Sequence, residues 1–281
     1  MIALLKVIFM AIVQGLSEFL PISSSGHLVF TSHIVELVSG NVDKIKTSYD
    51  IVLSMMLHVG TLIAVFIYFW KDISEIVKSF VNGIKSKKYD DYNTQLGFYV
   101  LWSTIATVII ALILNPTAET LMGRPAVVGF MLIITGCVLF FSEKLGDTQD
   151  TKENKITLRT AIIMGLAQGI AVLPGFSRSG WTIASGLLTG TNRVACAKYS
   201  FIMSLPIILC SSIVYPLVEV DMSEILSYNW KLILLGTIIS AIVGYICIKY
   251  FMAFLSKYSL KVFGYYCMIV GFIATLVFTF I

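Results

Sequence analysis

Long apolar runs alternate with short polar stretches along the whole chain. A helix needs roughly 20 apolar residues to cross the hydrocarbon core of a bilayer, which is about 30 Å thick. Ten runs are continuous enough to form helices, at residues 2–20, 25–38, 51–70, 97–114, 125–142, 160–173, 181–189, 196–218, 230–249 and 261–280.

Two of these runs, 25–38 and 181–189, are too short to span a bilayer. Each follows a break rich in Pro, Ser and Gly that comes directly after an apolar helix. Such pairs of short segments are typical of re-entrant hairpins. The pattern therefore predicts an all-α polytopic integral membrane protein with six spanning helices and two re-entrant helix hairpins, at 1–38 and 160–189.

The composition agrees with a location in the membrane. Charged residues make up 13% of the 281 residues, about half of the share usual in soluble domains. The polar stretches between the runs are too short for an extramembrane catalytic or nucleic-acid-binding domain. We therefore expect a single membrane domain over residues 1–281, with membrane lipid and no nucleic acid as partner.

The positions of Lys and Arg predict the orientation of the helices, because cytoplasmic loops carry an excess of both. If the two hairpins are re-entrant and six segments span, most of the 20 basic residues fall on one side of the membrane. The side that carries fewer of them holds both chain termini. This distribution predicts a multi-pass plasma-membrane protein with both termini outside the cell.

The two breaks belong to an internal repeat. Residues 14–26 read QGLSEFLPISSSG and residues 168–180 read QGIAVLPGFSRSG, and both stretches end Ser-x-Ser-Gly. The first hairpin would enter from outside and the second from inside, as in inverted-topology repeats, whose broken half-helices meet near the midplane. We predict repeat 1 at about 1–142 and repeat 2 at about 160–281.

The first break holds polar and charged groups at bilayer depth, where they are expensive and mark function. Gln14 and Glu18 share one helix face, and Pro21 ends or kinks that helix. A half-helix that starts after the break presents free amide groups and the positive end of its dipole, which suits an oxyanion such as phosphate. The candidate residues of this break are Gln14, Glu18, Ser23, Ser24, Ser25, Gly26 and His27.

The second break adds a permanent cation. Arg178 has a planar guanidinium that can grip two phosphate oxygens, and Ser177, Ser179 and Thr182 supply hydroxyls around it. Arg178 has no acidic neighbour in the sequence, so Glu18 or a bound phosphate would neutralise it. A purely structural interpretation also stands, in which the small residues allow close helix packing and Glu18–Arg178 is a stabilising pair.

Three segments carry a family resemblance: QGLSEFLPISSSGHL (14–28), MLHVGTLIAVFIYFWKD (56–72) and LPGFSRSGWT (173–182). With them the sequence resembles the undecaprenyl-diphosphate phosphatase, or bacitracin-resistance, family over essentially its whole length. The resemblance implies a bacterial plasma-membrane enzyme that hydrolyses this polyprenyl diphosphate to undecaprenyl phosphate and inorganic phosphate. It implies recycling of the lipid carrier for peptidoglycan synthesis, bacitracin resistance, and an active site that faces outside.

The resemblance also implies catalytic roles for Glu18, Ser24, His27 and Arg178. Glu18 would hold a divalent cation, Mg²⁺ or Ca²⁺, against the diphosphate. Ser24 or an activated water would attack phosphorus, with His27 as general base or acid and Arg178 stabilising the charge on the phosphate oxygens. Many members have glutamate where this chain has Gln14, so this chain has one sure carboxylate there. Substrate-binding roles fall to Gln14, Ser23, Ser25, Gly26, Ser177, Ser179 and Thr182.

Other readings of the sequence stay open. A lipid phosphatase of the type-2 phosphatidic-acid-phosphatase kind shares the Ser25-Gly26-His27 triplet, but no histidine follows Arg178 and no KxxxxxxRP element is present. A lipid transporter or flippase would also use inverted repeats. His33 and His58 are interpreted as helix-packing residues. The sequence leaves a homodimer open and does not choose between metals or prenyl chain lengths.

Overall fold

The computed structural model describes residues 2–39, 48–146, 154–219 and 222–280, and in these residues all the regular structure is α-helical. The helices are α1 (Ile2–Ser17), α2 (Ser24–Ser39), α3 (Ser48–Tyr68), α4 (Trp70–Ser86), α5 (Tyr92–Met122), α6 (Pro125–Gly146), α7 (Leu158–Ile170), α8 (Arg178–Leu188), α9 (Arg193–Glu219), α10 (Met222–Ser227), α11 (Trp230–Leu255) and α12 (Lys261–Phe280).

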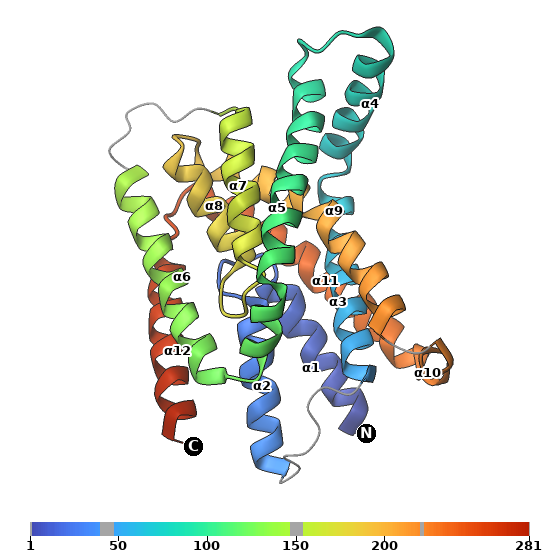
Figure 1. Ribbon diagram of the computed structural model, residues 1–281, viewed down its shortest axis with the longest axis vertical. Helices are drawn as coiled ribbons and strands as arrows, with labels where there is room; N and C mark the ends of the chain where they lie inside the picture. The colour runs from blue at the N-terminus through green and yellow to red at the C-terminus, as the bar shows by residue number, and fades with distance from the viewer. Residues whose placement is uncertain (1, 40–47, 147–153, 220–221, 281) are drawn as a thin grey trace.

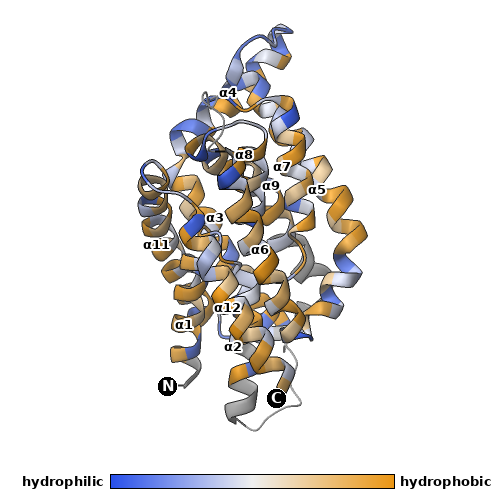
Figure 2. Ribbon diagram, turned by 90° about the vertical axis from the view of Figure 1, so that its left-hand side faces the viewer, coloured by the Kyte–Doolittle hydropathy of each residue, from blue (hydrophilic) through white to orange (hydrophobic). Residues whose placement is uncertain are grey.

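Six helices of the described chain are long and apolar enough to cross a membrane, namely α3, α5, α6, α9, α11 and α12. They coincide with the six segments that the sequence predicts as spans. The prediction of an all-α polytopic membrane protein is therefore confirmed. Apolar residues line the middle of the helices, and hydrophilic residues gather near the end that holds α4 (Figure 2).

Two helices, α4 and α10, were not predicted. In α4 the apolar residues recur every three to four positions, so they form no continuous run. Ile73 and Ile76 are buried, and Lys71 and Lys78 on other faces are exposed. The helix packs on α5, and together they form a hairpin that projects from one end of the molecule (Figure 1). An amphipathic helix of this kind is stabilised by packing on its neighbour.

The two pairs of short helices enter the molecule from opposite ends. In Figure 1, α1 rises from the lower end, the chain turns near the middle, and α2 returns to the lower end. Helices α7 and α8 make the same excursion from the upper end, so the two turns meet inside the bundle. The N- and C-terminal ends of the chain both lie at the lower end, as the predicted topology requires.

Equivalent helices of the two halves make equivalent contacts. Helix α1 packs on α11, and its counterpart α7 packs on α5. Helix α3 contacts its counterpart α9, and α6 packs along α12. This pairing agrees with an inverted repeat. The exact extents of the repeats, about 1–142 and 160–281, stay predictions.

Small residues allow the close approach of α7 to α5. A Cβ atom at Gly169 would lie 2.6 Å from the Cβ of Ile110 and 2.9 Å from the carbonyl oxygen of Thr107. One turn earlier, the carbonyl oxygen of Gly165 accepts a hydrogen bond of 2.9 Å from the Thr107 hydroxyl. Close backbone contact and interhelical hydrogen bonds are the usual means of helix association in membranes.

We expect Gly169→Ala to lower the free energy of unfolding by about 1–3 kcal/mol, because the added methyl group forces α7 away from α5. Gly123→Ala is the matched control, since a Cβ there meets only the Thr120 carbonyl oxygen, at 3.9 Å. Thermal unfolding of the purified variants in detergent measures the difference. Equal melting temperatures would contradict the close α5–α7 contact.

Candidate active site

The two breaks in the chain are fastened to each other. The Ser23 hydroxyl donates to the carbonyl oxygen of Phe176 across 3.5 Å, and the Ser179 hydroxyl donates to the carbonyl oxygen of Leu20 across 3.1 Å. Each break thus satisfies a backbone carbonyl of the other. Unpaired carbonyls at membrane depth would cost several kcal/mol each, so these contacts hold the breaks together.

The half-helices that leave the breaks begin in the same way. The Ser23 hydroxyl accepts a hydrogen bond of 3.2 Å from the amide of Gly26, and the Ser177 hydroxyl accepts one of 3.1 Å from the amide of Gly180. Serine in this place caps a helix N-terminus. Ser23 and Ser177 therefore cap the N-termini of α2 and α8. The sequence predicted a role for both only in substrate binding.

A cavity of about 240 Å³ lies where the breaks meet. Some of the predicted site residues line it: Glu18, Ser24, Ser25, Ser177 and Arg178. The others lie around it and do not line it: Gln14, Ser23, Gly26, His27, Ser179 and Thr182. The lining also includes polar residues of α3, α5 and α7, among them His58, Thr107 and Gln168.

Glu18 is the centre of the polar groups at this cavity. Its Oε1 accepts a hydrogen bond of 2.5 Å from Arg178 Nη2, and the exposed fractions of the two side chains are 6% and 17%. Its Oε2 accepts from the Ser24 hydroxyl at 3.0 Å and from the Gln14 amide nitrogen at 2.9 Å. His58 Nε2 lies 3.7 Å from the same Oε2. The tertiary structure therefore neutralises Arg178 with Glu18, one of the two partners that the sequence suggested.

Arg178 keeps one donor free for a ligand. Its Nη1 is buried and has no hydrogen-bond partner among the described residues. The Oε1 of Gln168, a residue that lines the cavity, is unpaired in the same part of the structure. Buried polar atoms are nearly always paired, so such atoms beside a cavity point to a ligand or ordered water.

His27 does not face the cavity. Its Nδ1 donates to the carbonyl oxygen of Ser23 at 2.8 Å, and its Nε2 accepts from the Tyr266 hydroxyl at 2.8 Å. The two rings stack with centroids 5.8 Å apart. With both nitrogens used, His27 fastens α2 to α12. This geometry gives no support to the predicted role of His27 as general base or acid.

The remaining hydroxyl of the second motif is also occupied. Thr182 Oγ1 lies 2.6 Å from the Ser200 hydroxyl and donates to the Arg178 carbonyl oxygen at 2.8 Å. It therefore joins α8 to α9. Its assignment to substrate binding stays a prediction.

Comparisons with known proteins show which family the chain belongs to. The family described as bacitracin resistance protein BacA matches residues 7–273. The chain belongs to this family. It is 42% identical to the undecaprenyl-diphosphatase of Halothermothrix orenii, with 95% of each chain covered. The undecaprenyl-diphosphatases of Methanosphaera stadtmanae and Methanobrevibacter smithii are 37% and 36% identical, with 97% and 96% of each chain covered.

In this BacA-family protein the sequence interpretation missed one residue of the cavity, His58. It was assigned to helix packing because it stands alone in an apolar segment. The available signal was that a titratable group in the middle of a span is expensive and marks function. His58 lies 40 residues from Glu18 in the sequence, so only the packing of α3 against the first hairpin brings the two side chains together.

The cavity does not gather the ligands of a resident divalent cation. No group of three or more His, Cys, Asp and Glu side chains that could hold a metal occurs in the described part of the chain. Glu18 is the only carboxylate among the lining residues, and both of its oxygens already accept from Arg178, Ser24 or Gln14. Mg²⁺ and Ca²⁺ need several free oxygen ligands. The protein residues alone therefore do not fit the predicted metal site.

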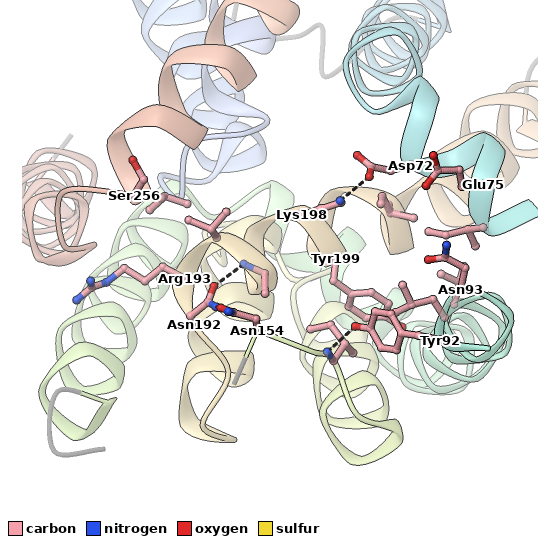
Figure 3. A pocket seen from close by; sticks show the side chains of 18 residues that line it. Asp72, Glu75, Tyr92, Asn93, Asn154, Asn192, Arg193, Lys198, Tyr199 and Ser256 are labelled. Atoms are coloured by element: carbon pink, nitrogen blue, oxygen red, sulfur yellow. Dashed lines mark hydrogen bonds and ion pairs between the residues drawn. The ribbon is translucent and has the colours of Figure 1, made fainter. Parts of the chain in front are cut away.

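A larger cavity, of about 560 Å³, is lined by residues of α4, α5 and α9, among them Asp72, Tyr92 and Lys198 (Figure 3). None of the predicted site residues lines it. Lys198 Nζ pairs there with Asp72 at 2.5 Å, and Arg193 pairs with Glu143. Among the described residues, the buried side-chain atoms without a hydrogen-bond partner include Arg178 Nη1 and Gln168 Oε1 at the smaller cavity and none from the lining of the larger one, so the smaller cavity is the better candidate for an anionic substrate.

We expect Glu18→Gln to destabilise the protein by about 3 kcal/mol or more, because it leaves the buried charge of Arg178 without a counter-ion. Asp72→Asn is the matched control. It breaks an ion pair of the same 2.5 Å length whose side chains are 35% and 42% exposed, so about 0–1 kcal/mol is expected. Thermal unfolding in detergent compares the two variants. An equal loss of stability in both would contradict the burial of the Glu18–Arg178 pair.

Proposed function

We propose that this BacA-family protein hydrolyses undecaprenyl diphosphate to undecaprenyl phosphate and inorganic phosphate. The observation that carries the proposal is the buried, unpaired Nη1 of Arg178 beside a polar cavity, in a chain that is 34–42% identical to proteins named undecaprenyl-diphosphatase. The reaction would recycle the lipid carrier for peptidoglycan synthesis. Faster removal of the diphosphate would leave less of it for bacitracin, which accounts for the family description.

Arg178 supplies the permanent positive charge for the terminal phosphate. One of its terminal nitrogens is held by Glu18, which fixes the plane of the guanidinium, while Nη1 is free to donate to a phosphate oxygen. Arg178 is also the first residue of α8, so the free amides and the dipole of that helix add to the positive potential. Such fixed donors stabilise the charge on the equatorial oxygens during phosphoryl transfer.

Ser24 or a water molecule beside it attacks the terminal phosphorus. A new P–O bond forms, the bond from phosphorus to the bridging oxygen breaks, and undecaprenyl phosphate leaves. The Ser24 hydroxyl donates to Glu18 Oε2 at 3.0 Å, which orients its oxygen. Ser25 and Ser177 line the same cavity and can contact the phosphates. Gln14 holds Glu18 in place through its amide nitrogen.

A divalent cation, Mg²⁺ or Ca²⁺, enters as part of the substrate in this proposal. The diphosphate carries several anionic oxygens, and these supply the hard ligands that the cavity lacks. Glu18, the one carboxylate among the lining residues, would be the protein group to help hold it.

We further propose a bacterial plasma membrane and a cavity that opens to the outside. The end of the bundle that holds the α4–α5 hairpin carries lysines such as Lys85, Lys87 and Lys88, and the two chain termini lie at the other end. Under the positive-inside rule the lysine-rich end is cytoplasmic. The first hairpin, with Glu18 and Ser24, then enters from outside. A single domain of two inverted repeats, 1–142 and 160–281, is part of this proposal.

Release of inorganic phosphate from farnesyl diphosphate by purified protein in detergent tests the activity. We expect release that requires a divalent cation and that falls about 10²–10³-fold in Arg178→Ala, because a fixed donor to the phosphate is lost. Arg159→Ala, at an exposed position outside the cavity, is the control and should keep its activity. A folded wild-type protein that releases no phosphate would overturn the proposal and favour lipid transport.

Labelling with a membrane-impermeant thiol reagent tests the orientation. In a background without the five native cysteines, we expect Arg124→Cys to react in intact cells and Lys88→Cys to react only after permeabilisation. Both positions are exposed and lie at opposite ends of α5, outside its apolar part. The reverse pattern of labelling would place the first hairpin in the cytoplasm.

A further inference from the structure

The three histidines of the chain share one local geometry. In each, Nδ1 lies within hydrogen-bond distance of the carbonyl oxygen four residues earlier, at 2.8 Å in His27, 2.9 Å in His33 and 2.8 Å in His58. A carbonyl oxygen only accepts, so Nδ1 carries the hydrogen in all three. The neutral ring therefore has its lone pair on Nε2.

What differs among the three histidines is the group that Nε2 faces. In His27 the acceptor is used by the Tyr266 hydroxyl at 2.8 Å. His33 meets the ring of Phe278 edge to face, with centroids 6.0 Å apart. His58 lines the cavity, with its Nε2 3.7 Å from Glu18 Oε2. Of the three, His58 alone presents its acceptor to the site where the phosphate would bind.

The 3.7 Å between His58 Nε2 and Glu18 Oε2 leaves the two atoms without a direct hydrogen bond. A neutral Nε2 and a carboxylate oxygen both accept, and 3.7 Å is too long for a hydrogen bond between them. A donor near both atoms can bridge them. The Ser24 hydroxyl already donates to the same Oε2 at 3.0 Å, so the nucleophile and the imidazole meet at one carboxylate oxygen.

We propose that His58 is the catalytic base of the reaction, a role that rests on the proposed phosphatase function. As the oxygen of Ser24 or of a water bonds to the terminal phosphorus, its proton passes to His58 Nε2, and the bond to the bridging oxygen breaks. On the Ser24 route the imidazolium gives this proton to the departing undecaprenyl phosphate. Water then attacks the phosphoserine, a proton of that water passes through His58 to the Ser24 oxygen, the bond between this oxygen and phosphorus breaks, and inorganic phosphate leaves. On the water route the imidazolium gives its proton directly to the phosphate products. Each turnover consumes one water and leaves His58 neutral.

The charges around His58 favour this assignment. The titratable and charged side chains that line the cavity are Glu18, His58 and Arg178. Glu18 is held by Arg178 through Oε1 and accepts two further hydrogen bonds at Oε2, so three of its roughly four acceptor sites are engaged. It stands beside the imidazolium that forms on His58 and stabilises it. Arg178 contacts the opposite carboxylate oxygen.

Glutamine substitution of the three histidines forms a matched set, measured as phosphate release from farnesyl diphosphate over a range of pH. We expect His58→Gln to lower kcat about 10²–10⁴-fold with little change in KM, as loss of a general base does. This variant should also lack the acid limb of the pH profile, that is, the decrease of kcat/KM toward acid pH. His33→Gln should match the wild type. His27→Gln should keep the acid limb, because its ring does not face the cavity.

Rescue by added imidazole separates a proton carrier from a residue that only packs. Imidazole should restore turnover to His58→Ala at least tenfold and should do nothing for His27→Ala. If His58→Gln keeps near-normal kcat and the acid limb, the proposal for His58 is wrong and the phosphatase stands. The same holds if the acid limb disappears in His27→Gln instead. A wild-type protein without phosphate release would overturn both proposals.

Discussion

The ion pair between Glu18 and Arg178 is the interaction on which the rest of this structure depends. The two residues lie 160 positions apart, and each charge alone would be costly inside a bilayer. Neither half of the chain can therefore bury its own charged group without the other. The two re-entrant hairpins have to meet from opposite ends of the bundle, and the six spanning helices hold them in that position.

The two breaks have the same backbone contacts but carry different functional side chains. Ser23 and Ser177 cap the two half-helices in the same way, and a serine from each break bonds to a carbonyl of the other. When residues 14–26 are aligned with residues 168–180, however, Ser24 corresponds to Arg178, and Glu18 corresponds to Val172. One hairpin thus brings the carboxylate and the hydroxyl, and the other brings the cation. Polar groups of both hairpins therefore line the cavity, and neither hairpin forms it alone.

The histidines show why a motif and a site are different things. His27 belongs to the first motif, yet its contacts with Ser23 and Tyr266 turn it toward α12. His58 lies outside the two breaks, in the segment 56–72 that also carries the family resemblance, and the packing of α3 against the hairpins turns it into the cavity. Proximity in sequence describes which residues share a turn. The direction in which a side chain points depends on the helices that surround it.

The sequence by itself determined the six spans, the two breaks and the family, because apolar length and repeated Pro/Ser/Gly motifs are properties of contiguous residues. It also marked Glu18, Ser24 and Arg178, since charged and polar groups at bilayer depth stand out in an apolar chain. It missed α4, because the apolar residues of this helix recur every three to four positions and form no continuous run. Only the tertiary structure decided which predicted residues line the cavity, that Glu18 neutralises Arg178, and which histidine faces them. Those facts depend on distances between segments far apart in the chain, and no local pattern encodes such distances.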